Sequence, residues 1–84
     1  MEHRTHPEIT KRLRRIEGHV KSIVTMIEAG RSCLEIAQQM QAAERALKGA
    51  KETLIRDHLD QCLDKAVTNG TTALTEFKEI TKYL

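Results

Sequence analysis

Hydrophobic residues in the first third of the chain recur every three or four positions, the spacing of one face of an α-helix. Thr5 and Glu8 stand in the arrangement of a capping box, and Pro7 is tolerated in a first turn. Gly30 is a residue type on which helices commonly end. We therefore expect a helix between Thr5 and Gly30 with one apolar face. That face consists of Ile9, Leu13, Ile16, Val20, Ile23 and Ile27.

A second helical pattern begins at Ser32, which forms another capping box with Glu35, and it runs unbroken to the sequence TNG at residues 68–70. Gly49 inside it costs about 1 kcal/mol relative to alanine, but the surrounding alanines and charged residues favour helix. The predicted helix of roughly 35 residues is about three times the mean length. We expect its large apolar contacts to come mainly from one set, with Ala37 and Ala43 as small residues between them. The set is Ile36, Met40, Leu47, Leu54, Leu59 and Leu63.

After Gly70 a short third helix carries Leu74, Phe77, Ile80 and Leu84. The predicted fold is therefore all-α, with a medium, a long and a short helix in a single domain over residues 1–84.

Composition limits what such a chain can do alone. It has 84 residues, 39% of them hydrophobic, and Phe77 and Tyr83 are its only aromatic residues. Domains of this size often need a metal, a disulfide or oligomerisation for stability, so a self-sufficient monomer is not expected. No stretch reaches the roughly 20 apolar residues that span a membrane, and no signal region opens the chain, so we expect a cytosolic protein. No glycine-rich loop or acid–base pair suggests an enzyme.

The two cysteines and one histidine have a suggestive spacing. His58 and Cys62 are four residues apart and share a helix face, and Cys33 precedes His58 by nearly seven helical turns. Along one helix, however, Cys33 and His58 lie about 37 Å apart, too far to share a metal ion. Two copies packed antiparallel, crossing near residues 46–47, would place Cys33 of one chain against His58 and Cys62 of the other. The alternative is that these are ordinary packing residues, and spacing alone leaves both interpretations open.

Three segments resemble the CsoR/RcnR family of metal-sensing repressors, which also contains formaldehyde sensors. They are RLRRIEGHVKSIVTMIEAGRSC, IAQQMQAAERAL and HLDQC, and the likeness extends from Lys11 to Tyr83. The resemblance implies a disc-shaped assembly, usually a tetramer built from antiparallel four-helix dimers. It also implies binding of operator DNA in the apo state, with release on inducer binding. It matches Cys33, His58 and Cys62 to the ligands of the family.

The resemblance leaves the inducer open between two kinds of metal. The Cys–His–Cys trio is that of the copper branch and suits three-coordinate Cu(I), although Ser32 stands where that branch commonly has a tyrosine. The nickel and cobalt branch adds nitrogen ligands from the N-terminal segment, where His3 and His6 are available. Divalent nickel and cobalt favour such imidazole-containing sites. We expect Ni(II) or Co(II) slightly ahead of Cu(I), and the other interpretation of these histidines is a frayed terminus.

Two further functions compete. A formaldehyde- or thiol-responsive repressor would react covalently at Cys33, but Glu2 stands where formaldehyde sensors have proline, and they have no cysteine at the place of Cys62. A purely structural helical dimerisation module is the third possibility.

Basic residues cluster on the first helix and could neutralise DNA phosphates, although a solvated helix face is the simpler interpretation. A net charge of +2 is low for a DNA-binding protein, so several copies of the patch would have to act together. Glu76 and Glu79 are candidate outer-shell groups for the metal, and His19 is expected to be a packing or surface residue. The candidate DNA-binding residues are Lys11, Arg12, Arg14 and Arg15, with Arg45 and Lys48 as approximate matches to a basic family position.

Overall fold

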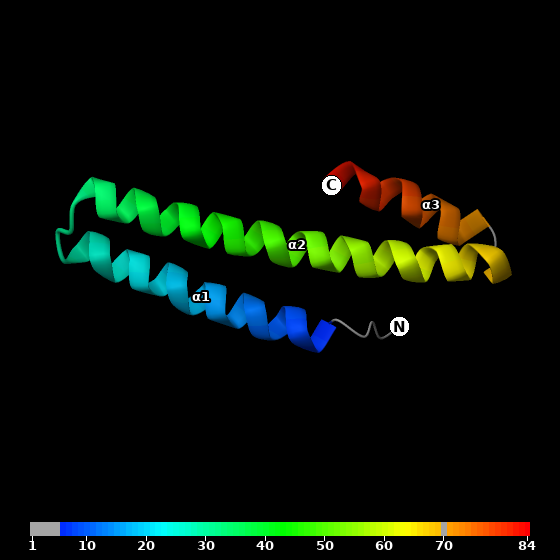
Figure 1. Ribbon diagram of the computed structural model, residues 1–84, viewed down its shortest axis with the longest axis horizontal. Coiled ribbons are helices and arrows are strands. Elements are labelled where there is room, and N and C mark those ends of the chain that lie inside the picture. The colour runs from blue at the N-terminus through cyan, green and yellow to red at the C-terminus, as the bar shows by residue number, and fades with distance from the viewer. Residues whose placement is uncertain (1–5, 70) are drawn as a thin grey trace.

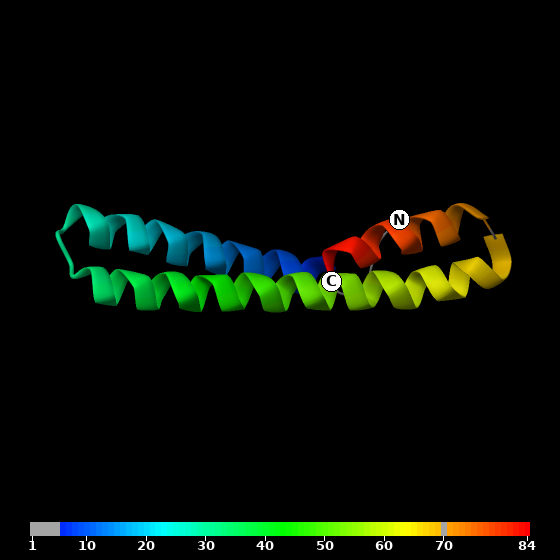
Figure 2. The ribbon, with the colours of Figure 1, turned by 90° about the horizontal axis from the view of Figure 1, so that it is seen from above.

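The computed structural model describes residues 6–69 and 71–84, and the side chains of residues 6–60 and 74–84. Helix α1 spans His6–Glu28, α2 spans Cys33–Asn69, α3 spans Thr71–Ile80, and a 3-10 turn, η1, follows at Thr81–Tyr83. The chain thus has the predicted medium, long and short helices. Helix α1 runs antiparallel along the first part of α2, and α3 folds back along its last part (Figures 1 and 2).

The turn between α1 and α2 forms as its sequence predicts. Gly30 has a φ of 72°, a left-handed conformation that other residues adopt only at a cost. Its N–H donates to Ile27 O at 3.1 Å, and Arg31 N–H donates to Met26 O at 3.0 Å, the two bonds of a Schellman motif. Ser32 then caps α2, because its hydroxyl accepts the Glu35 N–H at 3.2 Å.

Glu35 departs from the predicted capping box. Its carboxylate accepts a hydrogen bond from Arg31 Nε at 2.8 Å and lies 2.6 Å from Arg31 Nη2. This ion pair joins Arg31, the residue before the cap, to the first turn of α2. The Glu35 carboxylate therefore pairs with Arg31 and not, as a capping box would require, with Ser32.

The contact between α1 and α2 is built on small residues of the long helix. Among the described side chains, the buried hydrophobic residues are Ile9 and Ile23 of α1 and Ala43, Ala50 and Ile55 of α2. Alanines allow the two helices to approach closely, so two isoleucines of α1 suffice to fill the contact. None of the described large residues expected to supply the contacts of α2 is among these buried side chains.

Large apolar side chains instead remain half-exposed. On α1, Leu13, Val20 and Ile27 are 42%, 47% and 52% exposed, although they belong to the same predicted apolar face as the buried Ile9 and Ile23. The apolar face of α1 is wider than its contact with α2, so it divides into a buried and an open part.

The open part continues on α2. Met40 and Leu47 are 50% and 51% exposed. Together with Leu13, Val20 and Ile27 they form what we call the open apolar face.

The molecule is too elongated to cover its own apolar surface. Its radius of gyration is 17.3 Å, whereas a compact domain of this length has about 12 Å. Its accessible surface is 6605 Å², about 1,500 Å² more than expected for a folded monomer of this mass. None of the helices in the described ranges has the length and apolar character needed to cross a membrane.

The Schellman turn gives a direct test of this hairpin. Gly30→Ala forces a Cβ into the left-handed region and should lower the free energy of unfolding by about 1–2 kcal/mol. Gly18→Ala is the matched control: a Cβ there meets no atom within 4 Å and Gly18 has no positive φ, so the change should stabilise α1 by about 0.5–1 kcal/mol. Urea unfolding at one fixed protein concentration measures both. Equal effects at the two positions would contradict the assigned turn.

Candidate functional site

Cys33 is a free, exposed thiol at the first residue of α2. His58 lies far along the same helix, and its side chain is only 12% exposed. The two residues therefore lie about 37 Å apart along the helix, in a molecule whose longest dimension is 56 Å. Within the described residues, no three or more His, Cys, Asp or Glu side chains are grouped to hold a metal ion. His3 and the side chain of Cys62 lie outside the described residues, so their predicted roles stay predictions.

His58 is joined to the third helix. Its Nε2 lies 3.2 Å from a carboxylate oxygen of Glu76 on α3. The structure thus brings together two residues that the sequence analysis singled out separately. A carboxylate on one ring nitrogen of a histidine fixes the ring orientation and raises the basicity of the other nitrogen, which is the usual role of a partner behind a metal ligand.

Glu79, the other predicted outer-shell residue, has a different partner. Its carboxylate binds Lys82 Nζ at 3.1 Å, one turn further along the chain. Glu76 and Glu79 both line a cleft of about 500 Å³ between α2 and the α3–η1 segment, with Lys51 and Tyr83 on its rim.

His6 begins α1 and is half-buried. Figure 1 shows the start of α1 beside the middle of α2, short of the part that carries His58. His6 therefore lies away from the end of α2 that carries Cys33.

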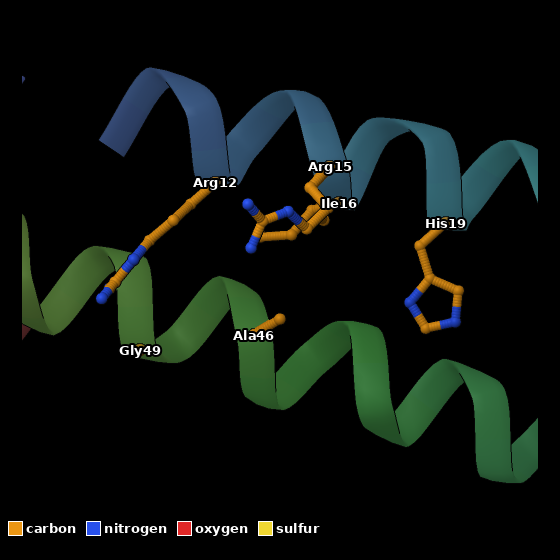
Figure 3. A pocket seen from close by; sticks show the side chains of 6 residues that line it. All are labelled: Arg12, Arg15, Ile16, His19, Ala46 and Gly49. Carbon is orange, nitrogen blue, oxygen red and sulfur yellow. The ribbon is translucent and has the colours of Figure 1, made fainter. Parts of the chain in front are cut away.

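The predicted basic residues fall into two groups. Arg12 and Arg15 project from α1 toward α2 (Figure 3). Arg12 Nη1 donates to the hydroxyl of Thr53 at 3.2 Å, and that hydroxyl donates to Gly49 O at 3.0 Å. The other four are exposed, as Arg15 is too, and in the described parts of the chain they form no ion pair. They are Lys11, Arg14, Arg45 and Lys48.

His19 links the first two helices, in agreement with a packing role. Its Nε2 lies 2.7 Å from the amide oxygen Oε1 of Gln39 on α2. Sequence reasoning did not find Gln39 or Thr53 as partners of α1, because both contacts depend on how the two helices are aligned. Neither residue lies at a hydrophobic position or in a motif that would have marked it.

The three-helix chain carries a thiol at the start of α2 and an oriented imidazole far along the same helix, and it is similar to known proteins. The family of metal-sensitive transcriptional repressors matches residues 5–83. The chain belongs to this family, which consists of repressors and not of enzymes. The resemblance found from the sequence is confirmed.

Two characterised relatives sense copper. The copper-sensing repressor CsoR of Bacillus subtilis (strain 168) is 37% identical, over 89% of this chain and 80% of that protein. The copper-sensing repressor RicR of Mycobacterium tuberculosis (strain ATCC 25618 / H37Rv) is 40% identical, over 71% of this chain and 62% of that protein.

Solved structures of the same shape include sensors of two metals. The nickel-responsive transcriptional regulator InrS has a TM-score of 0.84 and 29% identity, over 99% of this chain and 96% of the other. The copper-sensing repressor CsoR with Cu(I) from Geobacillus thermodenitrificans NG80-2 has a TM-score of 0.82 and 35% identity, over 99% and 92%.

Proposed function

We propose that this protein is a cytoplasmic repressor that binds operator DNA without metal and releases it on binding Ni(II) or Co(II), which derepresses metal efflux genes. The metal site is shared between two chains, with Cys33 of one and His58 and Cys62 of the other. The observation that carries the proposal is the placement of Cys33 at the first residue of α2 and of His58 about two thirds of the way along the same helix. Two antiparallel copies bring these two positions together twice, as a two-fold dimer requires.

The open apolar face supplies a reason for the two copies to associate. Leu13, Val20 and Ile27 of α1, with Met40 and Leu47 of α2, are each about half-exposed in the single chain. The excess surface of about 1,500 Å² per chain is of the size that obligate dimers bury. Covering it with a second copy gives an antiparallel four-helix core, and pairs of such dimers give the tetramer that the family resemblance implies.

Choice of metal depends on the N-terminal ligands. A site of Cys33, His58 and Cys62 alone offers two thiolates and one imidazole, which suits Cu(I). Addition of His6 or His3 raises the number of nitrogen ligands toward what Ni(II) and Co(II) prefer. His6 lies at the start of α1, beside the middle of α2 and away from the end of α2 that carries Cys33. This position supports the second arrangement. Cu(I) is the rival inducer, because the characterised relatives named above sense copper.

A metal can release DNA only by binding the DNA-free form more tightly, and the coupling is reciprocal. Glu76 supports a route for such coupling, since it connects the imidazole of His58 to α3. A ligand set that pulls His58 toward Cys33 of the partner chain changes how two α2 helices cross. The basic residues of α1 move with them, so the charged surface loses its match to DNA.

A covalent sensor is the second candidate, favoured by the exposure of the Cys33 thiol. Such a sensor needs Cys33 to react with an aldehyde or a persulfide and does not need Cys62. Release of DNA by formaldehyde from a Cys62→Ala protein, with no release by any metal from the wild type, would favour it.

Leu47→Glu tests the dimer. A carboxylate at the centre of an apolar interface loses hydration without a partner, which costs several kcal/mol, so we expect the associated species to disappear. Gln38→Glu is the matched control: it adds the same charge to an exposed site on the opposite side of α2. Sedimentation velocity on the metal-free proteins gives the result. Association of the Leu47→Glu protein at the wild-type level would rule out the proposed interface.

Mixing of two inactive variants tests whether the site is shared. Cys33→Ala and His58→Ala chains should each bind metal weakly, but after unfolding and refolding together each mixed dimer should hold one complete site. A mixture of His58→Ala and Cys62→Ala chains is the control, because both changes fall in the same half of the site and no complete site forms. Absorption of the thiolate–metal bands measures the recovery. No recovery in the first mixture would place the ligands within one chain.

Anaerobic titration of the reduced protein identifies the metal ion that it senses. With Ni(II) or Co(II) we expect thiolate charge-transfer bands and a fall in DNA affinity of about 5- to 150-fold. His6→Ala or His3→Ala should weaken Ni(II) binding at least about tenfold, the loss seen even for outer partners of ligands, while His19→Gln should not. The DNA is a duplex that the metal-free protein selects from a random library. Release by Cu(I) alone, unaffected by both N-terminal changes, would make the protein a copper sensor.

A further inference from the structure

The cavity between α1 and α2 has an unusual lining. It holds about 340 Å³ and is lined by two arginines and a histidine of α1, together with Ile16 and two small residues of α2. Arg12, Arg15 and His19 all project into the space between the helices (Figure 3). The α2 wall at this point consists of Ala46 and Gly49, so no long side chain of α2 occupies it.

The positive charge of this cavity is only partly neutralised. Arg12 Nε lies 4.0 Å from a carboxylate oxygen of Glu8, a long contact at a side chain that is 41% exposed. The exposed guanidinium group of Arg15 forms no ion pair or hydrogen bond with any of the described residues. Two guanidinium groups one turn apart repel each other, and an anion between them would relieve that repulsion.

His19 adds a third polar group with a defined orientation. Because Gln39 Oε1 accepts from Nε2, the second ring nitrogen, Nδ1, is left to face another group. Figure 3 shows Nδ1, the nitrogen next to Cγ, on the side of the cavity where Arg15 lies. Because the Nε2–H is turned to Gln39, Nδ1 of the neutral ring is an acceptor, so the donors that face a bound anion are the two guanidinium groups and the ring forms a polar wall beside them.

Gly49 leaves the cavity open, although close packing of the two helices does not require a glycine there. Within a helix, glycine costs about 1 kcal/mol relative to alanine. A Cβ at this position would meet no atom within 4 Å, so no close approach of another group requires the glycine. Its effect on the structure is to leave the floor of the cavity without a side chain, directly under the guanidinium group that Thr53 holds in place.

The cavity also opens away from the proposed dimer interface. At about 100° per residue, residues 12, 15 and 19 lie roughly 100–160° around α1 from Leu13. Residues 46 and 49 lie at a similar angle from Leu47 on α2. The open apolar face and the cavity therefore flank the contact between α1 and α2 on opposite sides, and a partner chain on one side leaves the other accessible.

We propose that this cavity binds one phosphate group, held between the guanidinium groups of Arg12 and Arg15 beside the ring of His19. Planar guanidinium groups bind phosphate oxygens through paired hydrogen bonds, which favours phosphate over a monovalent halide. The phosphate belongs either to the DNA backbone or to a free anion. The first source rests on the proposed function, and a phosphate seated between two helices would then fix the protein on the duplex more rigidly than exposed lysines do.

Inorganic phosphate and a DNA duplex are the two probes of this site. Phosphate added to the metal-free protein should shift the Arg12 and Arg15 side-chain Nε–H resonances saturably, whereas chloride at equal ionic strength should not. The Gly49→Glu substitution puts a carboxylate in the cavity and should abolish these shifts. Gly49→Ala should keep these shifts and stabilise the helix. The loss in the Gly49→Glu protein would then come from the added carboxylate and not from replacement of the glycine.

DNA binding of the same variants identifies the source of the phosphate. If it is the DNA backbone, Gly49→Glu should weaken binding of the selected duplex at least about tenfold and reduce the salt slope by about one. Gln38→Glu adds the same charge on the side of α2 that carries Gly49, but outside the cavity. This variant should retain the wild-type dependence of DNA affinity on salt. Phosphate shifts without these losses would assign the site to a free anion.

Absence of both the phosphate shifts and the selective loss in Gly49→Glu would overturn the proposal. If the wild type selects no duplex at all, the proposed repressor function fails, and the phosphate titration still decides the cavity on its own.

Discussion

The length of α2 is the constraint on which the rest of the structure depends. A helix of 37 residues cannot be covered by the two shorter helices of its own chain, which lie end to end along it (Figures 1 and 2). Stability of a helix in water comes mainly from packing of its apolar face, so a partly covered long helix leaves apolar surface for the proposed partner chain. The same length separates Cys33 from His58. Association and metal binding are therefore two consequences of one feature, because the partner that covers the helix also completes the proposed site.

The two sides of the α1–α2 pair have different chemistry. Small residues of α2 face α1, and where they are smallest, at Ala46 and Gly49, the space admits the arginines of α1. Large residues such as Leu47 face away from that contact. This division assigns opposite sides of one helix pair to a second protein chain and to an anion. A protein with a net charge of only +2 can thereby hold a phosphate at one defined point, since charge concentrated between two helices substitutes for charge spread over a surface.

Local signals predicted the helices well, and the packing less well. Gly30 and Ser32 specify the α1–α2 turn through hydrogen bonds between near neighbours, which sequence alone contains. The burial of Ile9 and Ile23, with Leu13 left open, depends on the angle at which α1 meets α2, and hydrophobic periodicity does not encode that angle. The pairing of His58 with Glu76 could be suspected from the residue types. The Arg12–Thr53 contact could not, because the alignment of two helices decides it.

The position of the cavity along α2 bears on how metal could act on DNA. In an antiparallel pair the two α2 helices cross near residues 46–47, which is the level of Ala46 and Gly49. Each phosphate cavity then lies close to the crossing, while the metal sites lie toward the ends of the pair. A small change of crossing angle imposed at the metal sites alters the relative orientation of the two cavities as rigid bodies, one of the established kinds of switch between subunits. Phosphates on a duplex have fixed spacing, so two cavities that match it in one orientation fail to match it in the other. No local unfolding is needed, and the open apolar face can stay packed throughout.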